Sequence, residues 1–123
     1  MYLGIDYGTS GCRATVIDQQ HELIAEVSLP LPAPERVAGR VQQQPKLWLE
    51  GLQGLFAALS RKLKLKRIQR LAIDGTSGSV LLCDRQGRVL TPALMYNDAS
   101  SQSAVDIIRR HCPDPQHVTL SAG

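Results

Sequence analysis

The residues best suited to chemistry lie near the start of the chain, in the segment Ile5-Asp6-Tyr7-Gly8-Thr9-Ser10-Gly11-Cys12-Arg13. Asp6 ends a short apolar run, and hard cations such as Mg²⁺ prefer carboxylate oxygens. Glycines let a backbone approach phosphate closely, and loop amides and the hydroxyls of Thr9 and Ser10 donate hydrogen bonds to it. Arg13 adds a charge-assisted donor. The segment predicts either a phosphate-binding loop beside a metal ion or a tight hairpin turn, where these residue types are common.

A similar succession recurs later in the chain. An apolar run over residues 68–74 ends on Asp74, which Gly75-Thr76-Ser77-Gly78 follows. A third polar pair, Asn97 and Asp98, closes the run that begins at Pro92. Neither loop has the GK[ST] of a P-loop or the GxGxxG of a dinucleotide site. Taken singly, Asp74 and Asn97 are also common turn-capping residues.

Periodicity predicts the elements that position these loops. Strands are expected over residues 2–6, 14–18 and 23–29, forming a β-meander, with a loop over residues 30–45. A helix begins at Pro45, because apolar residues recur there at spacings of three and four. A strand over 68–74, a hairpin built from 79–84 and 89–96, and a helix over 101–111 follow. The order indicates an α/β fold, a mixed sheet with helices packed on it.

Composition narrows the function classes. Hydrophobic residues make up 43% and charged residues 20% of 123 residues, which is typical of one globular domain. The net charge of +3 argues against a dedicated nucleic-acid binder. The basic cluster of residues 61–70 is either a solvated helix end or an anion patch. No apolar run reaches the roughly 20 residues needed to span a bilayer.

Cysteine usage and the first residues predict a compartment. The three cysteines, Cys12, Cys83 and Cys112, show no CxxC spacing, and the chain runs from Met1 straight into an apparent strand. Reduced thiols in the cytoplasm and no signal peptide are therefore expected. Cys12 lies beside the first loop, and we expect it to be a packed thiol.

Four segments, in order, carry a family resemblance. Asp6-x-Gly8-Thr9-x-x-x-Arg13 resembles the first phosphate motif of the FGGY carbohydrate kinases. Residues 39–48, with Gly39, Gln43, Pro45 and Trp48, are similar to the segment that opens the family's first long helix. Residues 73–84 look like its sugar-contacting turn and following strand. Residues 92–98 look like a segment usually written with Trp where Tyr96 stands.

The resemblance implies a ribonuclease H-like (actin-like ATPase) fold with a mixed five-stranded sheet. Residues 1–123 would form the N-terminal, sugar-binding part of the first of two lobes, incomplete and without the C-terminal lobe. The implied activity is ATP-dependent phosphorylation of a sugar hydroxyl, with ATP, Mg²⁺ and a sugar as ligands and no nucleic acid or membrane partner. The resemblance leaves room for a homodimer.

The resemblance also implies site residues. Asp6 would position Mg²⁺ through water. The ATP phosphates would meet Gly8, Thr9, Ser10, Gly11 and Arg13. The sugar would meet Asp74, Gly75, Thr76, Ser77, Asn97 and Asp98. No catalytic base is expected in this chain, since the family's aspartate base lies beyond residue 123, and the chain alone is expected to be inactive.

Departures from the family pattern bear on the substrate. Xylulokinases typically carry Gln-Met-His after the strand, where this chain has the shorter Thr76-Ser77. Ser100 stands where the family often has an arginine, two residues after its aspartate. The Arg-Glu pair of glycerol kinases is absent. A pentulose, D-ribulose or D-xylulose, is the expected substrate. Two alternatives are an ATPase of the same superfamily with another task and a standalone, non-catalytic binding domain.

Overall fold

A computed structural model describes residues 1–111, which divide into two compact units. The first unit comprises residues 1–33 and 44–77, and the second comprises residues 34–43 and the described residues from 78 onward. Predictions that fall on residues 112–123, including Cys112, lie outside the described residues. Within residues 1–111, no helix is both long enough and apolar enough to cross a membrane.

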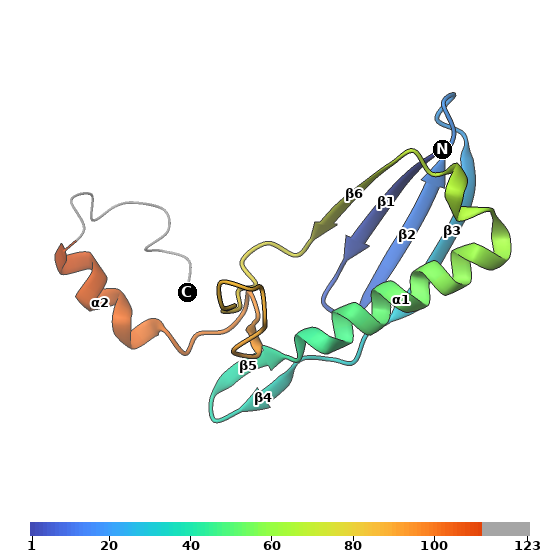
Figure 1. Cartoon of the computed structure of the whole chain (residues 1–123). Helices are drawn as coiled ribbons and strands as arrows, with labels where there is room; N and C mark the ends of the chain where they lie inside the picture. Colours follow the sequence, from blue (N-terminus) through green and yellow to red (C-terminus); the bar gives the residue numbers. More distant parts are fainter. Residues whose placement is uncertain (112–123) are drawn as a thin grey trace. The chain divides into compact units, whose positions relative to one another are not determined.

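The first unit is built on a four-stranded sheet in the order β3-β2-β1-β6 (Figure 1). Its strands are β1 (Tyr2–Tyr7), β2 (Gly11–Ile17), β3 (Leu23–Pro30) and β6 (Arg70–Gly75). β1 to β3 form the predicted antiparallel meander, and β6 pairs with β1 in parallel. A parallel partner requires a crossover connection, which the helix supplies.

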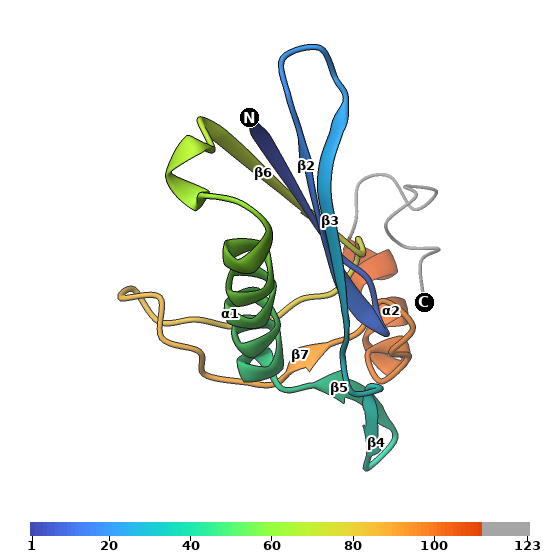
Figure 2. The ribbon, with the colours of Figure 1, turned by 90° about the vertical axis from the view of Figure 1, so that its right-hand side faces the viewer.

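Helix α1 (Pro45–Lys62) covers one face of this sheet (Figure 2). Alternation places Leu3, Ile5, Ala14 and Val16 on that face, where they are buried, because side chains point to opposite faces at successive strand positions. Leu55 and Leu59, one helical turn apart on α1, are 0% exposed and complete the core. A short 3-10 turn (Leu65–Arg67) leads from the helix to β6, which is exposed along its length.

The second unit contains a small sheet in the order β4-β5-β7. Its strands are β4 (Glu35–Val37), β5 (Arg40–Gln43) and β7 (Ala93–Leu94), and helix α2 (Gln102–His111) follows. The expected loop over residues 30–45 therefore contains a hairpin. Ala38 (φ 50°) and Gly39 (φ 82°) form its two-residue turn, and positive φ at both positions matches the twist of the paired strands.

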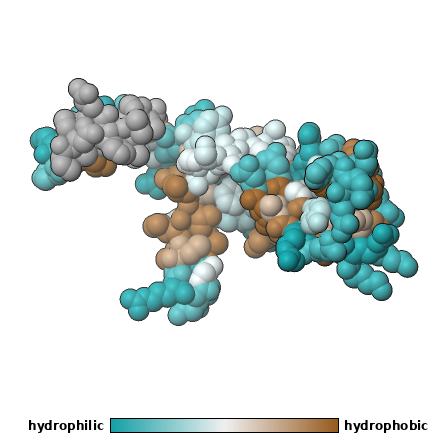
Figure 3. All heavy atoms as spheres, turned by 90° about the horizontal axis from the view of Figure 1, so that it is seen from above, coloured by the Kyte–Doolittle hydropathy of each residue, from teal (hydrophilic) through white to brown (hydrophobic). Residues whose placement is uncertain are grey.

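The predicted mixed sheet with a packed helix is confirmed. In the described part of the chain this sheet has four strands, whereas five were predicted. The predicted strand over residues 79–84 makes only isolated bridges, Val80 with Leu94 and Cys83 with Val89. These residues form a separate hairpin whose exposed apolar side chains include Val80, Leu82 and Leu90. Figure 3 shows that hydrophobic residues lie among hydrophilic ones on the visible surface.

Candidate functional site

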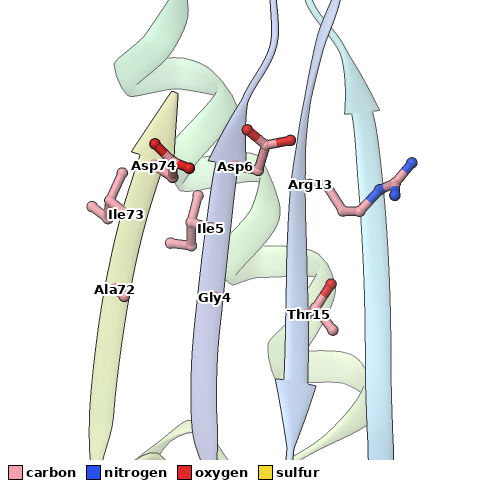
Figure 4. A pocket seen from close by; sticks show the side chains of 8 residues that line it. All are labelled: Gly4, Ile5, Asp6, Arg13, Thr15, Ala72, Ile73 and Asp74. Carbon is pink, nitrogen blue, oxygen red and sulfur yellow. The ribbon is translucent and has the colours of Figure 1, made fainter. Parts of the chain in front are cut away.

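Two carboxylates lie side by side at the ends of neighbouring strands. Asp6 on β1 and Asp74 on β6 are register partners in the parallel pair, so their side chains share one face of the sheet (Figure 4). This face is the one opposite to α1, and both residues are exposed. They line a hollow of about 270 Å³ together with Gly4, Thr15 and Ala72 among others. The sheet thus brings together two acidic residues that are distant in sequence.

The predicted phosphate loop is a tight connection between β1 and β2. The Gly8 amide donates to the Gly11 carbonyl oxygen at 2.8 Å, and the Leu31 amide donates to the Ser10 carbonyl oxygen at 2.9 Å. A second hollow, of about 390 Å³, is lined by Asp6, Gly8, Ser10, Gly11, Cys12, Arg13, Ser28, Leu29 and Pro30. Thr9 is not among its lining residues. Asp6 therefore borders both hollows, with the loop on one side and Asp74 on the other.

Arg13 lies on β2 and turns away from the Asp6 carboxylate (Figure 4). Its Nε donates to the Ser28 Oγ of β3 at 3.3 Å, so the guanidinium is held at the β3 side of the second hollow. Arg13 and Ser28 are thereby brought together, although sequence reasoning named only the arginine. The arrangement leaves an exposed cation next to the loop amides, where an anion would be attracted.

Tyr7 joins the two predicted loops, and sequence reasoning missed it. Its hydroxyl donates to the Trp48 carbonyl oxygen of α1 at 2.8 Å. Its own carbonyl oxygen accepts from the Thr76 amide at 2.9 Å and from the Thr76 hydroxyl at 3.4 Å. Burial raises the pKa of the Tyr7 phenol, so it remains a donor at neutral pH. Its place between Asp6 and Gly8 was the only sequence signal.

Cys12 is the packed thiol that the sequence predicted. It is 3% exposed and belongs to the core between the sheet and α1. Burial raises the pKa of the Cys12 thiol, because an apolar environment disfavours the thiolate. The thiol therefore stays protonated.

The end of β6 and the turn that follows it contain four predicted sugar-binding residues, Asp74, Gly75, Thr76 and Ser77. Asp74 Oδ1 accepts from the Gly75 amide at 2.8 Å, which is the turn-capping role weighed above. The residue is exposed, so its carboxylate is accessible to a ligand. Capping and ligand binding are therefore compatible at Asp74.

Asn97 and Asp98 belong to the second unit and differ from each other. Asn97 is exposed, whereas Asp98 is half-buried and accepts from the Val41 amide at 2.6 Å and from the Ser100 amide at 3.0 Å. The Ser100 hydroxyl also donates to Asp98, and this bond, more than the Val41 amide, holds the pKa of the Asp98 carboxyl below its usual range. Asp98 is thus a structural acceptor in its own unit.

The exposed carboxylates of Asp6 and Asp74 suit a hydrated Mg²⁺ ion better than a metal ion whose ligands all come from protein side chains. No group of three or more His, Cys, Asp or Glu gathers anywhere in residues 1–111. Mg²⁺ keeps several waters and takes one or two carboxylates plus phosphate oxygens. Asp6, an exposed carboxylate that lines the same hollow as Gly8, Ser10 and Gly11 of the loop, fits that requirement.

Comparison with known proteins decides the family. Residues 1–120 match the FGGY family of carbohydrate kinases, N-terminal domain. The chain belongs to the FGGY family. It is similar to the xylulose kinase of Escherichia coli (29% identical over 119 residues, 97% of this chain and 25% of the relative) and of Klebsiella pneumoniae (32% over 98 residues, 80% and 20%).

The fold of this FGGY chain agrees with solved structures. The xylulose kinase from Rhodospirillum rubrum superposes with a TM-score of 0.78 at 21% identity, covering 90% of this chain and 23% of that one. This confirms the actin-like ATPase fold that the motifs predicted. The chain spans 20–25% of the length of the two curated relatives.

Proposed function

We propose that the whole protein to which these residues belong phosphorylates a pentulose hydroxyl with ATP, and that D-xylulose is the first candidate substrate. The observation that carries the proposal is the position of Asp6, which borders the Gly8–Gly11 loop on one side and Asp74 on the other. The curated relatives, both xylulose kinases, favour xylulose over ribulose.

In this proposal the loop faces the ATP phosphates. The amides of Thr9 to Gly11 and the hydroxyls of Thr9 and Ser10 are the proposed donors, and Arg13 supplies the positive charge. Gly8 lines the site, and its own amide closes the turn by donating to the Gly11 carbonyl oxygen. Asp6, through water, would hold the Mg²⁺ that neutralises charge on the phosphate oxygens during transfer. Gly11 packs against β3, and the Tyr7 hydroxyl contacts α1. These contacts hold the loop in its conformation before ATP binds, which lowers the cost of positioning the phosphates.

The proposed sugar-binding residues are polar residues of two segments. Asp74, Gly75, Thr76 and Ser77 lie at the end of β6 and in the turn after it, and Asn97 and Asp98 lie in the turn of residues 95–98. Fixed donors and acceptors suit a polyol, because unpaired hydrogen-bonding groups on either partner are penalised on binding. The catalytic base and the adenosine pocket are proposed to lie in the remainder of the whole enzyme, so the 123 residues alone are expected not to turn over.

The test is phosphorylation of a pentulose panel by the whole enzyme, with Asp6→Asn as the variant and Asp18→Asn as the matched control. Asp18 lies at the opposite end of the same sheet. Its Oδ1 accepts from the amides of Gln20 and Glu22, and an asparagine oxygen preserves these bonds. We expect Asp6→Asn to lower kcat by about 100-fold or more, since metal positioning contributes several kcal/mol.

Each outcome has a reading. Unchanged turnover of Asp6→Asn at saturating Mg²⁺ would remove Asp6 from the mechanism. If the enzyme hydrolysed ATP and no pentulose stimulated this hydrolysis, the result would favour an ATPase of the same superfamily over a sugar kinase. Sugar-dependent ADP release by the 123 residues alone would show that the base lies within them.

A further inference from the structure

The β5–β7 ladder ends in an unusual way. Gln43 pairs with Ala93 and Gln42 with Leu94, and the Met95 amide donates to the Val41 carbonyl oxygen at 2.9 Å. In an antiparallel ladder the next bond would run from the Val41 amide back to the Met95 carbonyl oxygen. The Val41 amide instead donates to Asp98 Oδ2 at 2.6 Å. A side-chain carboxylate therefore takes the place of a backbone acceptor.

The displaced Met95 carbonyl oxygen has a new donor. The Asp98 amide donates to it at 2.9 Å, which closes the turn of residues 95–98. Met95, at the start of this turn, is 4% exposed, and the two central residues, Tyr96 and Asn97, are exposed. The turn thus presents Asn97 while its ends are anchored.

Gly78 supports the same turn from another segment. Its φ is +81°, and a Cβ added there would lie 3.3 Å from the Tyr96 Cβ, so the Tyr96 backbone packs closely on it. Asp98 holds the turn to β5, and Gly78 limits its movement at Tyr96. Both contacts lie within the second unit.

The Asp98 carboxylate has little capacity left for a ligand. Oδ1 accepts both the amide and the hydroxyl of Ser100, and Oδ2 accepts the Val41 amide. A carboxylate offers about four acceptor positions in all. A sugar hydroxyl that displaced the Val41 amide would leave a buried donor unpaired, because Val41 is 4% exposed.

We infer that Asp98 is a positioning residue for the sugar site, which caps the β5–β7 ladder so that the 95–98 turn presents Asn97 to the substrate. This inference rests on the proposed sugar kinase function. It assigns to Asp98 an indirect role in place of direct sugar contact. Ser100, which stands where the family often has an arginine, becomes part of the same cap.

A double-mutant cycle tests this role in the whole enzyme. The variants are Asn97→Ala, Asp98→Ala and the double variant, and the readouts are the KM for D-xylulose, the KM for ATP and amide hydrogen exchange at Val41. Asn97→Ala should raise the sugar KM about tenfold, the equivalent of one lost hydrogen bond, with Val41 protection unchanged. Asp98→Ala should raise the same KM about as much, leave the KM for ATP unchanged and speed Val41 exchange at least about tenfold.

The decisive comparison is the double variant. If Asp98 acts only through Asn97, the double variant should have a sugar KM within about threefold of Asn97→Ala alone, since coupled residues are not additive. Effects that multiply, with Val41 exchange unchanged, would show direct sugar contact and overturn the inference. An unchanged sugar KM in Asp98→Ala would overturn it as well.

Two further measurements keep the outcome unambiguous. If Asp98→Ala does not fold, Asp98→Asn replaces it, because the single acceptor oxygen of asparagine cannot accept from the Val41 amide and from the Ser100 amide at the same time. If the unmodified enzyme phosphorylates no sugar, the proposed function fails and the substrate role of Asp98 fails with it. Val41 exchange still decides whether Asp98 caps the ladder.

Discussion

Gly11 closes the phosphate loop where β2 begins, and it has no room for a side chain. It pairs with Pro30 of β3, and a Cβ added to it would lie 2.9 Å from the Leu29 carbonyl oxygen. Backbone atoms on both strands line this contact, so no rotamer change can relieve it. Gly11→Ala must therefore separate the strands locally by a few tenths of an ångström.

The magnitude follows from two opposing effects. Forcing one extra methyl group into a tightly packed place costs about 1–3 kcal/mol. Replacing glycine by alanine lowers the entropy of the unfolded chain and returns about 0.4–1 kcal/mol. At the midpoints of these two ranges, the net expectation for Gly11→Ala is a loss of about 1.3 kcal/mol in the free energy of unfolding.

Gly8, in the same loop, is the matched control. Its φ is not in the left-handed region, and an added Cβ would meet only the Gly11 carbonyl oxygen, at 3.4 Å. Gly8→Ala should change the free energy of unfolding by less than about 0.5 kcal/mol. Gly8 lines the hollow beside the loop, so in the whole enzyme the same variant should raise the KM for ATP.

Urea unfolding followed by the fluorescence of Trp48 measures both variants, since Trp48 is the chain's single tryptophan and packs against the core. The midpoint should fall for Gly11→Ala and stay in place for Gly8→Ala. Equal stability of the two variants would refute the steric reasoning. A Gly8→Ala enzyme with unchanged KM for ATP would refute the assignment of this loop to the phosphates.

Three further predictions concern the core, the Tyr7 contact and pH. Leu55→Ala, at a position that is 0% exposed, should lower the free energy of unfolding by about 2–5 kcal/mol in the same urea assay, whereas Leu49→Ala, at a position 60% exposed, should have little effect. Tyr7→Phe removes the donor to the Trp48 carbonyl oxygen and should cost about 0.5–1.5 kcal/mol; an unchanged midpoint would mean that the bond contributes nothing net. The hydrogen bond from the Arg88 side chain lowers the pKa of Asp84, and the bond from the Arg88 amide lowers it further. Ionised Asp84 therefore stabilises the folded state at pH values above its unfolded-state pKa of about 4. This contribution is lost as the pH falls through the lowered pKa of the folded state. The thermal midpoint should therefore fall as pH is lowered below about 4, and fall less in Asp84→Asn.

Much of the fold was predictable because its signals are local. Short strand-like runs separated by turn residues indicated β1 to β3, and spacings of three and four after Pro45 indicated α1. The strand predicted over residues 79–84 was wrong, because these residues have strand-forming types but make only isolated bridges. The hairpin over residues 35–43 was missed, since Ala38 is an uncommon residue for a turn with positive φ.

The sequence by itself determined that carboxylates follow two strand-like runs and that a glycine-rich loop follows the first, because residue type and strand length are local properties. Only the tertiary structure decided that Asp6 and Asp74 are neighbours, since parallel pairing of β1 with β6 depends on a crossover through α1. The structure also showed that Asp98 and Asn97 differ in their contacts. Their residue types suit the same polar site, but the Val41 amide that occupies Asp98 comes from a strand far away in the sequence.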